Sequence, residues 1–269
     1  MAGIFKIMRT SLAFFPIYIL GDQAMDVSKK SEHEMIRDLD NKSFNNLKEW
    51  VKPIIKEMFN NAKENDVIKC VVCNRYSKPD FTIEINNQRK YISLKSGRSD
   101  SVHFEGIKSF ILFLRKIGIS KETQRTILSF HYGDGTLDGT GLVRFGHGDI
   151  MVKMKDALKA ANNELNSKEV IKECLERFVF SGVEGRRISA DYLWFGDKNY
   201  ALSVSKEELI NFVNRKGYEY IRTLHIGPMT IQPYLRDVER KSKYPQKRHV
   251  VQVKWHYLLS DIQRIRNKM

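Results

Sequence analysis

The chain has 269 residues, of which 42% are hydrophobic and 29% charged, a composition typical of a globular protein with a substantial core. Its 46 Lys and Arg residues against 32 Asp and Glu give a net charge of +14. This excess favours polyanionic partners, nucleic acid first among them. Only three cysteines are present, Cys70, Cys73 and Cys174, which excludes a disulfide framework and indicates a reducing, cytoplasmic compartment.

The N-terminus carries a short apolar run from Ser11 to Leu20, preceded by two basic residues and interrupted by Pro16. A signal peptide is the alternative that this pattern raises, but the run is short and too short to span a bilayer. We therefore expect residues 1–25 to be an N-terminal extension, with Met25 as an alternative start.

The next hundred residues predict an α-β-β-β-α-β order. Apolar residues recur at helical spacing from Ser31 to Phe59, with a break near Asp40 after which Asn41 or Ser43 caps a second helix. The elements that follow are three strands, a helix and a further strand, expected at 67–73, 81–85, 90–94, 101–117 and 126–132 respectively.

The second half of the chain predicts a glycine-rich connection and then an α+β region. Residues 133–148 contain six glycines without the ending of a phosphate-binding P-loop, so the segment is either a plain connection or a loop that touches DNA. No amphipathic pattern indicates membrane binding. The later elements are two helices, a hairpin, a short helix and two strands, expected at 149–166, 168–178, 192–204, 206–214, 224–234 and 249–255.

The strongest physical argument comes from strand parity in the hairpin over 81–94. Because alternate residues of a strand share a face, a two- or four-residue turn at Asn86-Asn87 places Phe81, Ile83, Ile85, Ile92 and Leu94 on one face. The same register places Asp80 and Lys95 together on the opposite face. An ordinary amphipathic hairpin with a solvated polar face is the alternative explanation of this pattern.

The segments Lys78-Pro79-Asp80 and Ser93-Leu94-Lys95 resemble the motif of the PD-(D/E)xK nuclease superfamily. The resemblance covers roughly residues 31–132 and implies an α/β fold, with a restriction-endonuclease-like αβββαβ core, a mixed sheet and a C-terminal α+β part. It implies that Asp80 binds the metal and that Lys95 orients or activates the attacking water. The Leu94 carbonyl is implied as a further metal ligand.

Ser93 departs from the motif, which has Asp or Glu at this position. Some restriction-enzyme branches of the superfamily also have serine there and take the missing carboxylate from the following helix. Glu105, expected in the first turns of that helix, suits this role. Glu84 is the alternative acid, and the upstream helix offers Glu34, Glu49 and Glu57, among which the sequence does not choose.

The chemistry that these groups imply is metal-dependent hydrolysis. Two carboxylates about 4 Å apart repel each other by roughly 4 kcal/mol at an effective dielectric constant near 20. Mg²⁺, or Mn²⁺ as a substitute, would relieve that repulsion, and it prefers a few carboxylates together with water and phosphate oxygens. Such an ion would lower the pKa of the attacking water.

Two groups of residues are expected to contact double-stranded DNA. The first lies beside the predicted site and comprises Arg98, Ser99 and His103, whose side chains can donate to phosphate or sugar oxygens. His103 is also a candidate general acid or base. The second is a basic segment near the C-terminus, comprising Arg236, Arg240, Lys241, Lys243, Lys247 and Arg248.

Together these features predict a Mg²⁺-dependent DNA endonuclease, most similar to a type II restriction enzyme, with a nuclease core over 26–178 and a DNA-contacting α+β region over 179–269. The family resemblance makes a homodimer an open alternative. Two other functions remain, a structure-specific recombination or repair nuclease and a non-catalytic DNA-binding protein on a decayed nuclease core.

Overall fold

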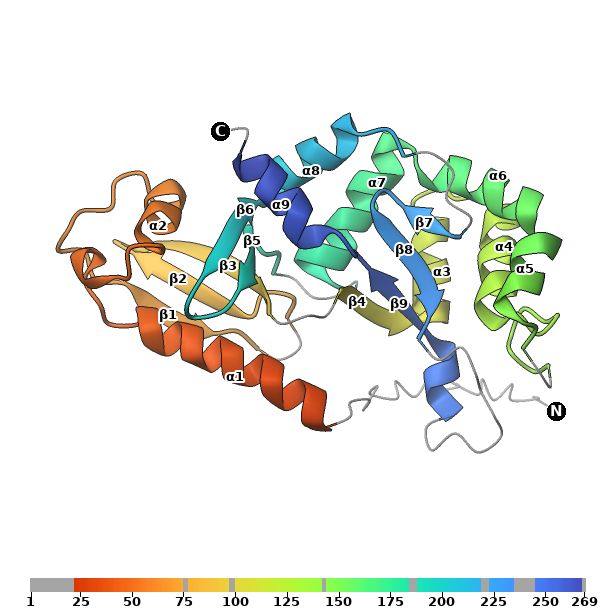
Figure 1. The fold of residues 1–269 in the computed structure, drawn as a ribbon, viewed down its shortest axis with the longest axis horizontal. Helices are drawn as coiled ribbons and strands as arrows, with labels where there is room; N and C mark the ends of the chain where they lie inside the picture. The colour runs from red at the N-terminus through yellow and green to blue at the C-terminus, as the bar shows by residue number, and fades with distance from the viewer. Residues whose placement is uncertain are drawn as a thin grey trace, which may run out of the picture.

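The chain folds as a mixed α/β protein around two β-sheets, each with its own hydrophobic core, as seen in a computed structural model (Figure 1). The structure describes residues 22–74, 77–96, 100–141, 144–183, 188–218, 223–234 and 245–267. No helix within these ranges is both long and apolar enough to cross a membrane. The mixed sheet and the additional α+β part that the sequence predicts are both present.

The first sheet has five strands in the order β1-β2-β3-β5-β6. Only the β3–β5 pair is parallel, which makes the sheet mixed. The strands are β1 Lys69–Val72, β2 Phe81–Ile85, β3 Gln88–Lys95, β5 Tyr192–Gly196 and β6 Ala201–Ser205.

The β2–β3 hairpin has the predicted two-residue turn. Asn86 and Asn87 adopt φ angles of 48° and 63°, as this tight turn requires, and Phe81 pairs with Ile92. The apolar face is buried as predicted. The opposite face is not simply solvated, however, because Thr82 and Ser93 are also buried there. Leu193 of β5 pairs with Ser93 and belongs to the hydrophobic core of the other sheet. Both faces of the first sheet are therefore covered at this point.

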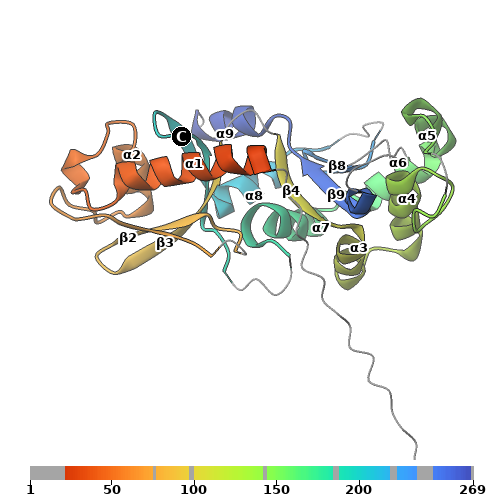
Figure 2. The ribbon, with the colours of Figure 1, turned by 90° about the horizontal axis from the view of Figure 1, so that it is seen from below.

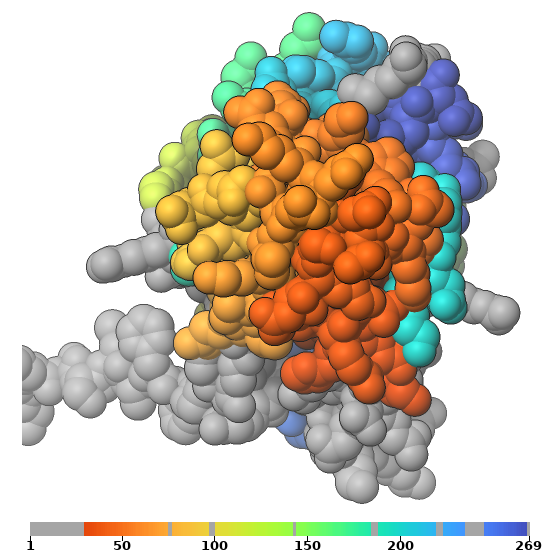
Figure 3. Space-filling model, turned by 90° about the vertical axis from the view of Figure 1, so that its left-hand side faces the viewer, coloured from red at the N-terminus to blue at the C-terminus, as the bar shows by residue number. Residues whose placement is uncertain are grey.

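Two helices cover the apolar face of this sheet, α1 Asp22–Leu39 and α2 Lys52–Met58 (Figure 2). Seen from its end, this part of the molecule presents the orange N-terminal segment beside the yellow β2–β3 hairpin (Figure 3), and α1 itself contacts β1. The predicted break near Asp40 is confirmed. The predicted cap is wrong: Ser43 precedes a short 3-10 turn, η1 Phe44–Asn46, without a capping bond, and α2 begins instead with Pro53 in its first turn.

The second sheet is antiparallel, with the strand order β4-β9-β8-β7. Its strands are β4 Ser101–Gly106, β9 Val250–Lys254, β8 Met229–Pro233 and β7 His225–Ile226. Helices pack on one face of this sheet, and α3 and α7 lie behind it in Figure 1. The helical elements of this region are α3 Ile107–Lys116, α4 Lys121–Tyr132, α5 His147–Lys153, α6 Lys155–Leu165, α7 Lys168–Leu175 and the π-helical turn η2 Glu176–Ser181.

Two predicted elements are corrected by the structure. Residues 101–106 form strand β4 instead of the start of a helix, because the apolar spacing that continues into α3 conceals a strand that joins the helix directly. Residues 126–132 belong to helix α4 instead of a strand. Ser120 caps that helix by accepting a hydrogen bond from the N–H of Thr123, and Gly133 ends it at φ 61°. The parallel neighbour of β3 is therefore β5.

The C-terminal region contains the predicted β5–β6 hairpin and the predicted helix, α8 Lys206–Arg215. The strand expected at 224–234 is instead the β7–β8 hairpin, and helix α9 Leu258–Arg266 follows β9. Each sheet draws strands from both sides of residue 178, since β5 and β6 complete the first sheet and β4 joins the second. The division between the sheets therefore does not follow the predicted boundary at that residue.

The start of α8 is held by a capping box. The hydroxyl of Ser205 accepts from the N–H of Glu208 at 3.2 Å, and the Glu208 carboxylate accepts from the N–H of Ser205 at 2.7 Å. We expect Ser205→Ala to lower the free energy of unfolding by about 1 kcal/mol in urea titrations. Ser260→Ala, which removes an exposed hydroxyl in α9, is the control, and equal losses in the two variants would contradict this role of the cap.

Candidate active site

Asp80 and Lys95 meet at the main chain of Leu94. The Oδ2 atom of Asp80 accepts a hydrogen bond from the Leu94 N–H at 2.5 Å. The Nζ atom of Lys95 donates to the Leu94 carbonyl oxygen at 3.2 Å. The two side chains predicted to converge therefore both bond to the main chain of one residue, Leu94. No ion pair within 4 Å is found between these two described side chains, so each charge remains available to a third group.

The surroundings of this pair are half-buried and polar. Among the described residues, Oδ1 of Asp80 has no hydrogen-bond partner, although Oδ2 is engaged. Ser93 is fully buried, and its hydroxyl likewise finds no partner in the described part of the chain. A buried polar group without a hydrogen-bond partner lowers the stability of a protein by about 1–3 kcal/mol. The Ser93 hydroxyl, close to Asp80 and Lys95 in the sequence, is such a group among the described residues.

Glu105 does not lie in a helix, as the sequence predicted, but on the inward face of β4. Arg177 of η2 binds both of its oxygens, with Nε at 2.9 Å from Oε1 and Nη2 at 2.6 Å from Oε2. Although burial alone would raise its pKa, these hydrogen bonds, together with that of His103, lower the pKa of Glu105 to about 2. Because the guanidinium occupies the carboxylate, Glu105 has no oxygen left that is not already paired.

The other predicted acids also have cationic partners. Glu84 pairs with Arg89 at 2.6 Å near the hairpin turn, four residues and therefore about 13 Å along the strand from Asp80. The candidate acids of the upstream helices form ion pairs as well, Glu34 with Lys198, Glu49 with Lys52 and Glu57 with Arg266. Within the described ranges, no group of three or more His, Cys, Asp or Glu side chains is placed to hold a metal ion.

The oxygen atoms around Asp80 therefore suit a magnesium ion only if the protein supplies few of its ligands. Mg²⁺ is often held by one or two carboxylates and completes its shell with water and substrate phosphate oxygens. Asp80 offers one carboxylate, and Oδ1 is its oxygen without a partner among the described residues. The Leu94 carbonyl, the other predicted ligand, accepts a hydrogen bond from Lys95.

The residues predicted to contact DNA lie only in part within the described ranges. Arg98, Ser99, Arg236, Arg240, Lys241 and Lys243 lie outside the described residues. Lys247 lies over the ring of Tyr234, 5.3 Å from its centroid. Arg248 instead pairs with Asp134 at 2.5 Å, so it holds the glycine-rich loop against the start of β9.

His103, which was predicted to contact DNA, is a buried residue of strand β4. Its ring is 6% exposed and stacks on Phe178 with 5.2 Å between the ring centroids. A buried imidazole at this depth cannot reach a phosphate or sugar. Burial lowers the pKa of His103 to about 4, so the ring is neutral near pH 7.

Two residues near the site were missed by the sequence argument. Lys78 donates from Nζ to the carbonyl oxygen of Val102 at 2.8 Å, which ties the segment before Asp80 to strand β4. Arg177 was read only as part of a helix, although a single arginine within the apolar run ending at Phe180 could have indicated a buried ion pair. Its guanidinium also lies over the ring of Phe113, 4.4 Å from the centroid.

We expect the protein to lose much of its stability in mild acid, because three of its described histidines are buried. Burial lowers the pKa of His103, His131 and His225 to about 4 each, below the ordinary 6.5. Between pH 6.5 and 4 the unfolded chain binds more protons than the folded one, so the free energy of unfolding falls as the pH falls, by roughly 3 kcal/mol for His103 alone. Glu105, with its pKa lowered from 4.5 to about 2, extends the loss to lower pH.

The measurement is thermal unfolding as a function of pH. Neither ring nitrogen of His225 has a partner in the part of the chain that the structure describes, so His225→Leu should flatten the dependence between pH 6.5 and 4. His33→Ala, at an exposed position in α1, is the control. A wild-type protein equally stable at pH 7 and pH 4.5 would refute the role of the buried histidines.

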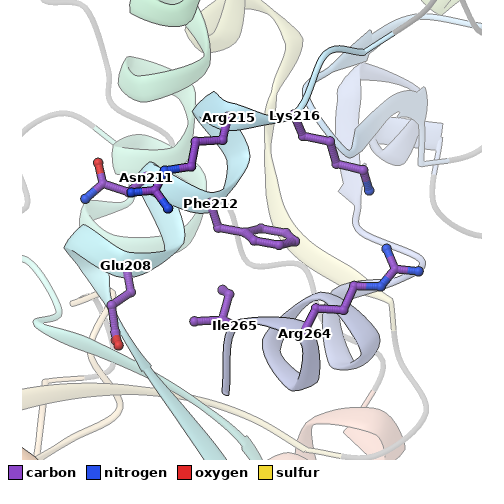
Figure 4. Close-up of a pocket in the computed structure, with 7 residues that line it drawn as sticks. All are labelled: Glu208, Asn211, Phe212, Arg215, Lys216, Arg264 and Ile265. Carbon is purple, nitrogen blue, oxygen red and sulfur yellow. The ribbon is translucent and has the colours of Figure 1, made fainter. Parts of the chain in front are cut away.

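A separate basic groove lies between α8 and α9 (Figure 4). Arg215, Lys216 and Arg264 stand on its rim, and the ring of Phe212 projects between the two helices. None of the residues predicted for catalysis or metal binding lines this groove, so it is distinct from the Asp80–Lys95 pair.

Comparisons with known proteins find a structural similarity but no sequence match. No protein-family model matches the chain, and no curated protein sequence matches it. Among solved structures, the chain is similar to a crystal structure of the restriction endonuclease MspI in complex with its cognate DNA. The TM-score is 0.45 with 13% sequence identity, over 85% of this chain and 88% of that chain.

Proposed function

We propose that this protein is a Mg²⁺-dependent endonuclease that hydrolyses phosphodiester bonds in double-stranded DNA. The observation that carries the proposal is the convergence of Asp80 and Lys95 on the two polar atoms of the Leu94 main chain. A carboxylate and an ammonium held this closely, without an ion pair between them, suit the binding of a cation and a phosphate side by side. The net charge of +14 favours a polyanionic substrate.

Each residue of the pair has a distinct part in this proposal. The Leu94 N–H fixes the Asp80 carboxylate through Oδ2, while Oδ1 has no hydrogen-bond partner among the described residues and would bind the ion. When bound, a magnesium ion would lower the pKa of the attacking water and offset charge on the phosphate. Lys95 would hold the attacking water or neutralise a phosphate oxygen, because its ammonium can exchange the Leu94 carbonyl for either.

At a finer level, we propose a type II restriction-like enzyme rather than a structure-specific repair nuclease. A second candidate has an observation in its favour: a DNA-binding protein on a decayed nuclease core. Ser93 stands where the motif carries an acid, and Glu105 is engaged by Arg177. In that case DNA binding would persist while hydrolysis would be absent.

The test is incubation of purified protein with supercoiled plasmid, with Mg²⁺, with Mn²⁺ and with EDTA. The endonuclease predicts linear or discrete fragments with either metal and none with EDTA, and Asp80→Asn should abolish them. Discrete fragments favour restriction, whereas preference for branched DNA favours a repair nuclease. Intact plasmid under every condition, with equal DNA binding by wild type and Asp80→Asn with or without metal, would establish the decayed binder.

A further inference from the structure

Among the described helices and strands, none covers the front face of the second sheet in Figure 1, and the side chains of this face differ from those of an ordinary solvated face. The inward residues of β8 and β9, such as Ile231, Val251 and Val253, are buried against the helices. The alternate residues form a row across three strands, in which Phe104 pairs with Gln252 and Gln252 with Gln232. In Figure 1 this face is turned toward the viewer, with α3 and α7 behind the sheet.

The two glutamines of this row are oriented by hydrogen bonds. The Nε2 atom of Gln232 donates to Oε1 of Gln252 at 2.9 Å. The Nε2 atom of Gln252 in turn donates to the hydroxyl of Ser101 at 2.5 Å. Both glutamines are half-buried, so the two amides stand side by side in fixed orientations at the protein surface. Such an arrangement loses little side-chain entropy when it binds a ligand.

Aromatic and basic residues flank the amide row. Phe104 and Tyr234 remain 47% and 38% exposed, and their rings meet edge to face with 5.2 Å between centroids. The ammonium of Lys247 lies over the Tyr234 ring, and Lys254 follows Gln252 by two residues on β9, with its ammonium 3.1 Å from Asp100. Exposed aromatic rings, amides and cations on one face match the chemistry of DNA, whose bases offer hydrogen-bonding edges and whose backbone is anionic.

This face is also close to the proposed active site. Strand β4 begins six residues after Lys95, which limits the chain path between Lys95 and Ser101 to about 20 Å. Lys78, two residues before Asp80, bonds to Val102 in the same strand. One turn of B-form DNA is about 34 Å long, so a duplex seated at Asp80 is long enough to reach the open face as well.

We propose that the open face of the second sheet binds double-stranded DNA and that Gln232 and Gln252 read base edges in the major groove. Some DNA-binding proteins use the strands of a β-sheet in a DNA groove, and the glutamine amide is matched to the N6 and N7 atoms of adenine. Phe104 packs against the bases or sugars of the DNA, while Lys247 contacts the DNA phosphate backbone. The inference rests on the proposed function for its substrate, but base reading requires binding alone and not cleavage.

The experiment is selection of bound duplexes from a randomised DNA pool in EDTA, where no cleavage occurs, followed by sequencing. Wild-type protein should enrich a short motif. Gln232→Ala and Gln252→Ala should each lose preference at one or two base pairs, with a loss of about tenfold in affinity for the wild-type motif and an unchanged salt dependence. Lys247→Ala should weaken binding to all sequences and reduce the slope of log K against log salt by about 1. Gln263→Ala, an exposed glutamine in α9, is the matched control.

The outcomes separate this inference from the proposed function. An enriched motif that changes in the two glutamine variants, in a protein that never cuts plasmid, would support the reading face and refute the nuclease. A protein that cuts plasmid while both glutamine variants enrich the wild-type motif would refute the reading face. Failure of the wild-type protein to enrich any motif would overturn it as well. Thermal unfolding of each variant confirms that it is folded before selection.

Discussion

Replacing Arg177 with methionine is expected to lower the free energy of unfolding by about 3–5 kcal/mol. The substitution leaves the Glu105 carboxylate, which is 4% exposed, without the guanidinium that binds both of its oxygens. The hydroxyl of Ser109 and the ring of Phe113 would lose contacts to the same group. Urea titration followed by circular dichroism measures the change.

Two comparisons make this expectation specific. Arg89→Met removes the partner of Glu84 near the exposed hairpin turn, where solvent screens the charges and the loss of stability should be much smaller. The double variant Arg177→Met with Glu105→Leu should recover most of the lost stability, because no unpaired charge then remains buried. If the double variant is as unstable as Arg177→Met alone, the cost comes from packing and not from the orphaned carboxylate.

The second large expected effect is on catalysis: Lys95→Ala should lower the single-turnover rate of DNA cleavage by about 10²- to 10³-fold. The ammonium is the only group of the pair that can neutralise a phosphate oxygen, and its one contact in the described structure is with the Leu94 carbonyl. The free energy of unfolding should therefore change little. Rates are measured with enzyme in excess over plasmid, together with the binding affinity for the same DNA.

The matched control for this variant is Lys90→Ala, on the same strand but near the hairpin turn, where Lys90 pairs with Ile83. It removes an equal charge from β3, so a general electrostatic effect would lower both rates alike. A Lys95→Ala protein that cleaves at the wild-type rate would remove this residue from the mechanism. Loss of DNA binding without loss of rate at saturating DNA would assign it to substrate affinity alone.

Local patterns in the sequence predicted the part of the molecule in which residues close along the chain meet. The alternation in β2 and β3 and the pair Asn86-Asn87 specify one register, and that register places Asp80 near Lys95. The helices over 31–59 and the hairpin over 192–204 follow from periodicity in the same way. In each case the sequence pattern and the contact that it predicts lie within about 25 residues of each other along the chain.

The sequence predicted the wrong secondary structure for elements that depend on residues far away along the chain. Strand β4 was read as a helix because its own six residues are too few to show a period, and β9, some 150 residues later, supplies its hydrogen bonds. Helix α4 contains β-branched and aromatic residues that favour a strand, but an N-cap and burial of Ile127 and Phe130 outweigh that preference.

By itself, then, the sequence determined the hairpin, the meeting of Asp80 with Lys95 and the basic charge, because these depend on strand parity and composition. Only the tertiary structure decided the partner of Glu105 and the neighbours of the hairpin. Arg177 is 72 residues from Glu105, and β5 lies about a hundred residues beyond β3, so no local period links them. Burial joined these groups, since a carboxylate removed from water requires a cation and a central strand requires a second neighbour.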